Sequence, residues 1–225
     1  MTKLTQLEKK IIGLCDAHVS ASTIFAAQLT LECQASDAYV LLQTLRDKKS
    51  LGFDQLVDVC GVDYLSYGQT QWDVSQVSSQ GFCRGVDRDN VVDHEGPRFA
   101  VVYHLLSTRH NHRVRVKAWC DNSLPKVASA NDLWASASWF ERETYEMYGI
   151  LFEGHPDLRR ILTDYGFIGH PFRKDFPVSG HVEMRYDASL KRVIYEPVDI
   201  EPRVLVPKVI RHDNRYVAEG VEDNG

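Results

Sequence analysis

Carboxylates, arginines and histidines crowd into one stretch of the chain, residues 139–176. Glu141, Glu143 and Glu146 lie close together in an expected helix, and paired carboxylates could perform general acid and base catalysis. Such catalysis needs a cleft and surroundings that push the two pKa values apart. Glu141 and Glu143, however, differ by about 200° around a helix, so they do not share a face. The spacing favours carboxylates that cap, pair with arginine or cross an interface.

His155 and His170 each precede a proline in this stretch. Each imidazole could orient chemistry, but proline fixes the backbone there and the ring offers one hydrogen-bond donor and one acceptor. We therefore interpret both histidines as loop anchors. Asp157 and Asp175 are the expected acceptors of the donated proton.

Four cations of the same stretch could clamp a phosphate: Arg159, Arg160, Arg173 and Lys174. No glycine-rich loop opens a helix beside them, and seven carboxylates within residues 139–176 compete for them. We expect these cations, together with Arg142, to form salt bridges within the fold or across an interface. The sequence also lacks a nucleophile elbow, a P-loop and a dinucleotide fingerprint, so we expect no catalytic residues in this chain.

His110 and His112 form a further motif, an HxH pair at an expected hairpin turn, which could bind a metal ion. No third ligand converges on the pair, so an exposed loop is the favoured interpretation. The five cysteines lie far apart and form no CxxC pair, which predicts reduced, mostly buried thiols: Cys15, Cys33, Cys60, Cys83 and Cys120. We expect the chain to bind no metal and no cofactor.

Composition narrows the class of protein further. The 26 basic and 31 acidic side chains give a net charge of −5, which offers no general attraction to nucleic acid or to anionic lipid. No window approaches the ~18 consecutive apolar residues that cross a bilayer, and the first residues lack a secretory hydrophobic core. We expect a soluble protein that faces the bacterial cytosol and reaches the membrane only through a complex.

Hydrophobic periodicity indicates the elements that position these residues. Helical spacing predicts one helix over residues 4–14 and a second over 36–45. An imperfect two-residue period predicts a strand over 53–64, with a shorter strand around 72–78. Residues 99–118 read as an antiparallel hairpin, with Arg113, Arg115 and Lys117 on a solvated face.

The carboxylate-rich helix is expected over residues 129–149, with Asn131 or Asp132 as its cap and Gly149 as its end. The order of elements predicts an α+β fold of two layers, a mostly antiparallel sheet with packed helices, and an extended C-terminal tail. We expect the α+β domain to span residues 1–178.

Residues 179–225 form the predicted tail. Pro197, Pro202 and Pro207 recur every five residues, which excludes a helix there and favours extended backbone. The segment is nevertheless too apolar for a disordered tail. Its own domain or a partner must cover it, and we favour a partner.

One signature connects these residues to a known family. It consists of Glu141-Arg142-Glu143, Glu146, Met147-Tyr148, His155, Arg159 and Ile161. This core, residues 141–161, resembles the signature of the 30 kDa (C-type) subunit family of NADH-quinone oxidoreductase, which is respiratory complex I. Residues 166–180 are similar to the continuation of the same family, and the insertion at 87–96 looks like an ordinary loop.

The resemblance implies a scaffold subunit of the peripheral arm, in the quinone module. FMN, iron–sulfur clusters and quinone, with ubiquinone expected, would lie in partner subunits. The expected partners are the quinone-cavity subunit, of the 49 kDa (D) type, and the adjacent iron–sulfur subunit, of the B type, and no nucleic acid. The assembled translocase would pass electrons from NADH to quinone and move protons, peripherally at the cytoplasmic side of the bacterial inner membrane.

The resemblance also implies which residues form the family signature and the partner interface: Glu141, Arg142, Glu143, Glu146, His155, Arg159, Arg160, His170, Arg173, Lys174 and Asp175. Two alternatives remain open. One is the equivalent subunit of a related membrane-bound hydrogenase or ferredoxin-fed complex. The other, of a different class, is a free-standing hydrolase that uses Glu141 or Glu143 with His155.

Overall fold

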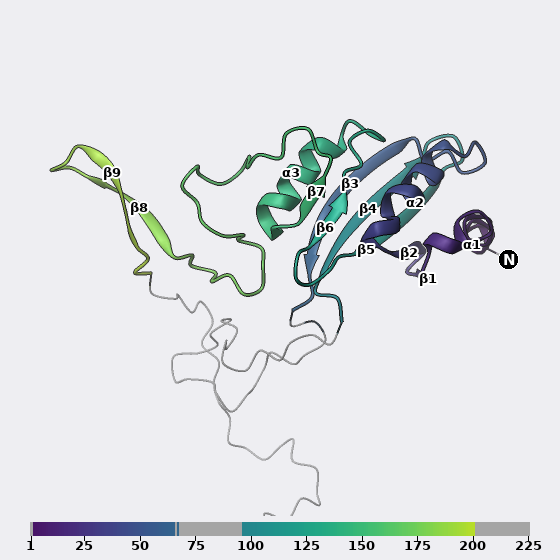
Figure 1. The fold of residues 1–225 in the computed structure, drawn as a ribbon, viewed down its shortest axis with the longest axis horizontal. Coiled ribbons are helices and arrows are strands. Elements are labelled where there is room, and N and C mark those ends of the chain that lie inside the picture. Colours follow the sequence, from purple (N-terminus) through teal and green to yellow (C-terminus); the bar gives the residue numbers. More distant parts are fainter. Residues whose placement is uncertain (1, 66, 68–95, 201–225) are drawn as a thin grey trace, which may run out of the picture. The chain divides into compact units, whose positions relative to one another are not determined.

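The computed structural model describes residues 2–65, 67 and 96–200 (Figure 1). The chain divides into two compact units, of which one comprises 1–67 with 91–180 and the other 68–90 with 181–225. The strand predicted around 72–78 and nearly all of the loop predicted at 87–96 lie outside the described residues.

The first unit is built on a five-stranded sheet with the order β1-β2-β5-β4-β3. Its strands are β1 (Ala21–Phe25), β2 (Gln28–Gln34), β3 (Gln55–Asp63), β4 (Phe99–Ser107) and β5 (His112–Trp119). Only the β2–β5 pair of this sheet is parallel. The predicted hairpin over 99–118 and the predicted strand over 53–64 are confirmed.

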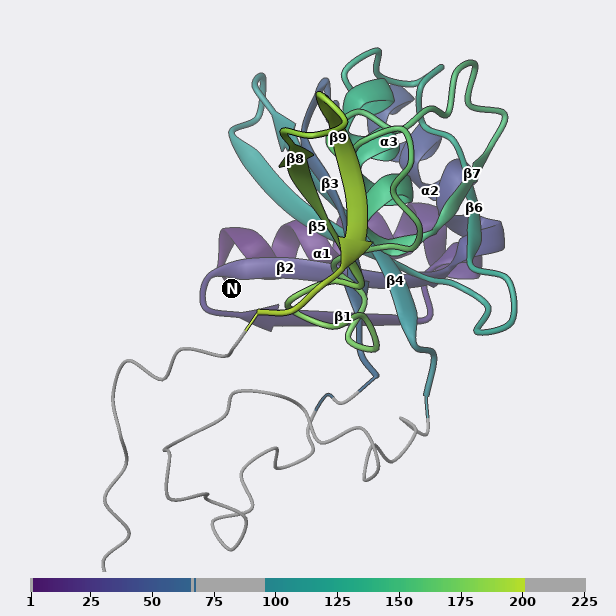
Figure 2. The same ribbon diagram turned by 90° about the vertical axis from the view of Figure 1, so that its left-hand side faces the viewer.

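The β1–β2 hairpin was not predicted, and its turn explains why. Ala26 and Ala27 occupy the two-residue turn with φ of 48° and 59°. Such turns normally carry asparagine or glycine, whereas an alanine there costs roughly 1–2 kcal/mol. The residue types therefore give no turn signal. In Figure 2, β1 and β2 run side by side.

Three α-helices accompany the sheet in the part of the chain that the structure describes: α1 (Lys3–Cys15), α2 (Ala35–Asp47) and α3 (Ala137–Tyr148). A 3-10 turn, η1 (Asp16–His18), follows α1. The first two helices confirm their predictions, as does the end of α3, where Gly149 has φ of 77°. None of the helices among the described residues is both long and apolar enough to cross a membrane.

The predicted start of α3 at residue 129 was wrong by eight residues. A short strand, β6 (Lys126–Ala128), pairs in parallel with β7 (Leu151–Glu153), and turns fill the interval before Ala137. Asn131 and Asp132 therefore lie in a turn and cap no helix. The carboxylate of Glu141 binds the backbone at Ala130 and thereby holds this interval away from the helix.

Strand register separates the two faces of the five-stranded sheet. One row places Val59, Tyr103, Val116 and Leu31 side by side on the same face. These side chains share a single hydrophobic core with residues of α1, α2 and α3. The helices therefore cover one face and form two layers with the sheet, which confirms the predicted α+β class.

The next row of the sheet turns to the opposite face: Cys60, Val102, Lys117 and Glu32. Here Lys117 lies 3.5 Å from the Glu32 carboxylate and stacks over the rings of Tyr64 and Trp119. Long side chains of this kind cover the apolar atoms beneath them with their methylene stems. This face carries the predicted basic row, of which Arg113 is exposed.

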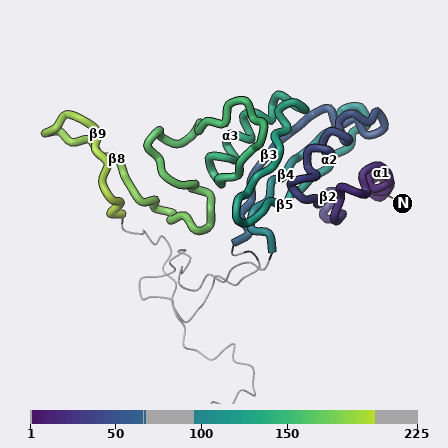
Figure 3. Tube along the Cα trace, in the orientation of Figure 1, coloured from purple at the N-terminus to yellow at the C-terminus, as the bar shows by residue number. Residues whose placement is uncertain are grey.

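In the second unit, the described residues form the hairpin of β8 (Val182–Asp187) and β9 (Arg192–Pro197). The extended backbone predicted for the start of the tail is present here. Pro202 and Pro207 lie outside the described residues. Figure 3 traces the chain between β7 and this hairpin as a long irregular path, in green.

Candidate functional site

Glu146 joins helix α3 to the segment that follows it. Its fully buried carboxylate accepts hydrogen bonds from the backbone N–H groups of Ile161 at 2.6 Å and Leu162 at 2.8 Å, and from that of Thr163. Burial alone would raise the pKa of Glu146, but these hydrogen bonds outweigh it and lower the pKa to about 2. An ionised carboxylate thus fixes three consecutive residues of an irregular segment.

Two further contacts hold that segment against the end of α3. The Nδ1 atom of His170 lies 2.8 Å from the carbonyl oxygen of Glu146. The backbone N–H of Phe172 donates a hydrogen bond to the carbonyl oxygen of Met147. The His170 ring also fills the space beside Gly149, where a Cβ would lie 2.7 Å from it. We call residues 155–178 the anchored loop.

Glu141 lies on the same helix and faces the core. Its buried carboxylate accepts from the Ser129 hydroxyl at 2.5 Å and from the Ala130 backbone N–H at 2.7 Å. Burial raises the pKa of Glu141 to about 7, against the opposing effect of these two hydrogen bonds and with a small contribution from Asp132. The structure therefore gives Glu141 and Glu146 opposite pKa shifts.

A pH dependence follows from the raised pKa of Glu141. The folded pKa of about 7 lies above the ordinary value of 4.5, so folding favours the protonated form. Its contribution to stability is complete below pH 4.5 and falls, by up to about 3 kcal/mol, as the pH rises through 7. We expect Glu141→Gln to remove this decline. Urea unfolding of both proteins across that pH range measures it, and an equal decline in the variant would contradict it.

His155 anchors the start of the loop through both ring nitrogens. Its Nε2 donates to the carbonyl oxygen of Ser138 at 3.2 Å, and its Nδ1 accepts from the backbone N–H of Asp157 at 3.0 Å. The expected carboxylate acceptors of His155 and His170 were therefore wrong. Backbone carbonyls take the donated protons because the anchored loop folds back onto α3.

Helix α3 approaches the sheet closely at Gly61 of β3. A Cβ on Gly61 would lie 2.6 Å from the Tyr148 ring and 3.1 Å from the Thr144 side chain. The Thr144 hydroxyl also lies 3.4 Å from the carbonyl oxygen of Val59. The glycine therefore permits the close approach, which fixes the position of the signature helix on the sheet.

A second cluster ties the far end of the anchored loop to the sheet. The Asp63 side chain, fully buried at the end of β3, accepts two hydrogen bonds from Arg98, at 2.9 and 2.8 Å, and one from the Lys174 backbone N–H at 2.9 Å. Burial would raise the pKa of Asp63, but these hydrogen bonds lower it. Arg98 also lies 3.0 Å from Asp175, which pairs with Arg173.

Phe99 lies under this cluster, with the guanidinium groups of Arg98 and Arg173 over its ring at 4.7 and 5.2 Å. Sequence reasoning included Arg173, Lys174 and Asp175 but missed Asp63 and Arg98. The register pairs Asp63 with Phe99, directly beside Arg98. The contact between Asp63 and Arg98 follows from that strand pairing, which the sequence alone does not give.

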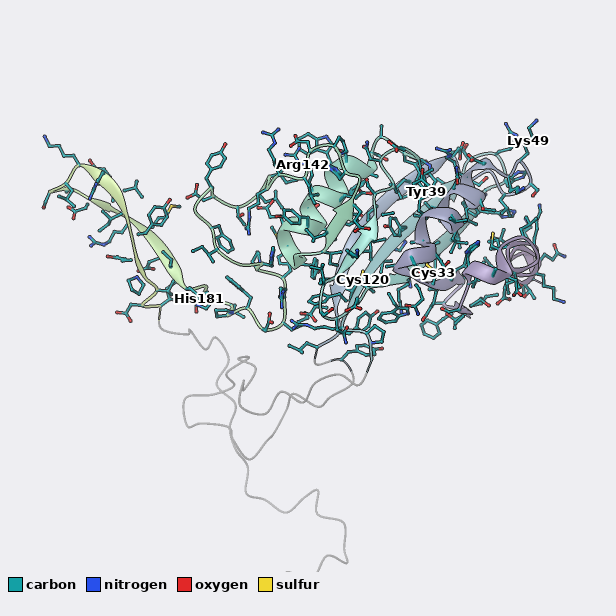
Figure 4. All side chains as sticks on the ribbon, viewed as in Figure 1. Cys33, Tyr39, Lys49, Cys120, Arg142 and His181 are labelled. Atoms are coloured by element: carbon teal, nitrogen blue, oxygen red, sulfur yellow. The ribbon has the colours of Figure 1, made fainter. Side chains whose placement is uncertain are left out.

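The remaining signature cations serve the anchored loop in different ways. Arg142, labelled on α3 in Figure 4, donates to the carbonyl oxygen of Arg159 and stacks over Trp139. Arg160 donates to the Thr163 hydroxyl and to the Gly169 carbonyl oxygen. Neither cation binds a carboxylate among the described residues, although Arg159 pairs with Asp157 at 2.7 Å, and salt bridges of Arg142 and Arg160 across an interface stay a prediction.

The anchored loop exposes large apolar side chains despite these contacts. Each of the following is more than half exposed: Leu162, Tyr165, Ile168, Phe172 and Val178. Exposed apolar groups of this size, held in place by buried polar contacts, are typical of a protein interaction surface.

The HxH pair and the cysteines show no binding geometry among the described residues. His110 lies 3.0 Å, through Nε2, from the carbonyl oxygen of Lys49, and its ring stacks on that of His112. Cys33 and Cys120, labelled in Figure 4, are buried and free, and burial raises the pKa of each thiol to about 12. No group of three or more potential metal ligands occurs in that part of the chain.

Comparison with known proteins decides the family. Residues 31–182 match the family model described as "Respiratory-chain NADH dehydrogenase, 30 Kd subunit". The chain belongs to this family. The resemblance stated from the signature residues is therefore confirmed over a much longer stretch than the signature itself.

Curated relatives of the family align over almost their whole length. The C-type subunit of NADH-quinone oxidoreductase from Legionella pneumophila (strain Paris) is 55% identical over 219 residues, which cover 96% of each chain. The protein of the same name from Coxiella burnetii (strain RSA 331 / Henzerling II) is 51% identical over 213 residues, 93% of each chain. A solved structure, "Nqo5 of the trypsin-resistant fragment (1-134) in P63 form", is 26% identical, covers 70% of this chain and 100% of that one, and has a TM-score of 0.49.

Within this 30 kDa family member, the arrangement is unsuited to hydrolysis. Both buried carboxylates accept hydrogen bonds from their own fold, and Glu143 is exposed. Both nitrogens of His155 already bind the backbone. Among the described residues, the groups named for the hydrolase alternative are thus engaged in contacts of the fold, and the same contacts suit a subunit that positions a surface.

Proposed function

We propose that this chain is a scaffold subunit of the peripheral arm of a bacterial NADH-quinone oxidoreductase, in its quinone module. The observation that carries the proposal is the anchored loop, an exposed apolar segment held in one conformation by the buried carboxylate of Glu146. Membership of the 30 kDa subunit family indicates the complex to which the chain would belong. The chain contributes positions for docking, and the complex contributes the oxidoreductase chemistry.

The partners that we propose are the quinone-cavity subunit, of the 49 kDa type, and the adjacent iron–sulfur subunit. FMN, iron–sulfur clusters and quinone would reside in partner subunits, and proton translocation would belong to the whole complex. The complex would place this chain at the cytoplasmic side of the bacterial inner membrane. The curated relatives, each named as the C-type subunit of this oxidoreductase, support the assignment.

The β8–β9 hairpin offers a second surface to the same assembly. Val182, Met184, Tyr186 and Val193 fall on one face of it by register, and each is more than half exposed. A two-stranded hairpin on its own is marginally stable in water. We propose that this apolar face lies against a neighbouring subunit, as expected for a C-terminal segment that wraps a partner.

Replacement of Arg159 tests the scaffold role. Its side chain is 74% exposed and its ion pair with Asp157 is at the surface, so it contributes little to the stability of the fold. We expect Arg159→Ala to lower the amount of assembled complex in membranes, measured by native electrophoresis. NADH:quinone turnover per assembled complex should stay unchanged.

Lys126→Ala is the matched control, because Lys126 forms an ion pair with Glu153 that is also at the surface, outside the anchored loop. It should leave assembly unaffected. Normal assembly with lost turnover in the Arg159 variant would indicate a catalytic contribution and would contradict the scaffold proposal.

A further inference from the structure

Three segments that lie far apart in the sequence are tied together by cationic residues. The Lys10 ammonium group of α1 donates to the carbonyl oxygen of Ser50, in the turn after α2, at 2.6 Å. In the turn between β4 and β5, the Nε2 atom of His110 lies 3.0 Å from the carbonyl oxygen of Lys49. We call the basic residues of these three segments the basic corner: Lys3, Lys10, Lys49, Arg109, His110 and His112.

The positive charges of the basic corner face solvent. Lys3, Lys10, Lys49 and Arg109 are exposed. The ammonium group of Lys10 binds a carbonyl oxygen, which carries no net charge, and Lys49 holds His110 through its backbone. None of the salt bridges formed among the described residues involves the basic corner.

Acidic residues near the corner in sequence have contacts of their own. Glu8 accepts a hydrogen bond from a hydroxyl group of β1 at 2.7 Å, and Asp47 pairs with the preceding arginine at 2.7 Å. Asp54, on whose charge Arg109 acts, accepts two hydrogen bonds from Thr108. These carboxylates are therefore used to hold the local fold together.

The two histidines of the corner report the sign of the local potential. Their rings stack with centroids 5.9 Å apart. Burial lowers the pKa of His112, and the positive charges of His110, Lys10 and Lys3 lower it further. All three of these neighbouring charges are positive, so an anion bound at the corner would relieve repulsion that the fold retains.

The arrangement of the cations indicates the kind of anion. They stand on separate segments, and the lysines carry point charges on flexible stems, which suits several carboxylates spread along a chain better than one compact phosphate. A lipid surface is less well matched, because stable membrane binding needs a second, apolar signal beside the charge. Residues 48–50 and 108–113 contain no apolar side chain that could supply it. The net charge of −5 gives no general attraction to nucleic acid.

We propose that the basic corner binds an acidic segment of a neighbouring subunit, whose aspartate and glutamate carboxylates pair with Lys10, Lys49 and Arg109. This inference rests on the proposed function, since it takes the partner from the same assembly. It adds an electrostatic contact to the apolar surfaces of the anchored loop and the β8–β9 hairpin. Complementary charge of this kind speeds association and selects the partner.

Zero-length crosslinking of the intact complex tests the proposal. A carbodiimide activates a carboxylate, the lysine nitrogen bonds to its carbonyl carbon, and one carboxylate oxygen leaves with the reagent as a urea. The full chain is tagged, purified from membranes with its complex and crosslinked. We expect mass spectrometry to find isopeptide bonds from Lys10 or Lys49 to acidic residues of another subunit. Lys126 should couple to Glu153 within the chain, 2.9 Å away, which shows that the reagent has worked.

Two substitutions of Lys49 provide matched variants, because its side chain is exposed and its contact with His110 uses the backbone. Lys49→Glu should lower the yield of Lys10 adducts several-fold, since the reversed charge repels the acidic segment. Lys49→Arg keeps the charge and should preserve the yield. High salt should lower the yield of the Lys10 adducts, because it screens exposed charges.

The outcomes separate this proposal from the proposed function. If the chain co-purifies with NADH-oxidising subunits but Lys10 and Lys49 form no adduct to another subunit, the basic-corner proposal alone is overturned. Adducts that survive Lys49→Glu unchanged overturn it as well. So does binding of the purified chain to phosphatidylserine vesicles that Lys49→Glu abolishes, when no adduct forms in the complex, since the corner would then bind a membrane surface. Failure to co-purify overturns the proposed function and the basic-corner proposal with it.

Discussion

Replacing Glu146 with alanine is expected to lower the free energy of unfolding by about 3–5 kcal/mol, the largest effect of any single carboxylate in the signature. In the variant, the backbone N–H groups of residues 161–163 lose the buried carboxylate of Glu146, which accepts a hydrogen bond from each of them. The loss should appear as a lower urea midpoint and, in membranes, as a lower amount of assembled complex.

Glu146→Gln is the matched variant, because it keeps the shape and one acceptor oxygen but removes the charge. We expect an intermediate loss of stability. The pH dependence gives a second readout, since the folded pKa of about 2 lies below the ordinary 4.5. The contribution of Glu146 is therefore complete above pH 4.5 and is lost as the pH falls toward 2, a decline that the glutamine variant should lack. Equal stability of all three proteins would contradict the role assigned to Glu146.

Sequence periodicity predicted the parts of the fold that follow a simple rule. The alternation of Arg113 to Ala118 predicted β5, and the apolar spacing in residues 36–45 predicted α2. The β1–β2 hairpin escaped because Ala26 and Ala27 adopt a turn for which alanine gives no signal. The start of α3 escaped because a tertiary contact, from Glu141 to Ala130, decides where that helix begins.

The candidate site shows the same limit. The sequence identified residues 139–176 as the important segment, because charged and aromatic residues are dense there and their types and spacing can be read from one stretch of sequence. The partners of those charges were not visible, because they are backbone groups of a folded-back loop or residues distant in the chain. Glu146 binds N–H groups at residues 161–163 in place of an arginine, and Lys174 binds Asp63 across 111 positions.

Glu141 and Glu146 of the signature lie on one helix and have opposite pKa shifts, which indicates that they have different roles. Glu141 faces the core with two donors, and burial dominates its pKa. Glu146 receives three backbone donors, and hydrogen bonding dominates its pKa. In an active site, such a pair would suggest an acid and a base. Here both carboxylates are buried, so the separation reflects two structural roles, one that holds the turns before α3 and one that holds the anchored loop after it.

Loss of the Arg98 guanidinium is the second change with a large expected effect. Arg98→Met leaves the carboxylate of Asp63 buried and without its cation, which is expected to cost about 3–5 kcal/mol of unfolding free energy. It also removes the contact between Arg98 and Asp175, so the far end of the anchored loop loses one of its contacts with the sheet end. Urea unfolding measures the first consequence, and the yield of assembled complex measures the second.

Two controls separate a buried ion pair from a simple loss of contacts. Arg185→Met breaks a bidentate pair of similar geometry, with Glu196, at an exposed site in the second unit, so we expect little change. Adding Asp63→Asn to Arg98→Met removes the uncompensated charge while an amide oxygen can still accept from the Lys174 backbone. The double variant should therefore be more stable than Arg98→Met alone, as a double-mutant cycle would show. If the double variant is less stable than the single, the penalty does not arise from an unpaired Asp63 charge, and the cluster would stabilise the loop through the packing of Arg98 on Phe99.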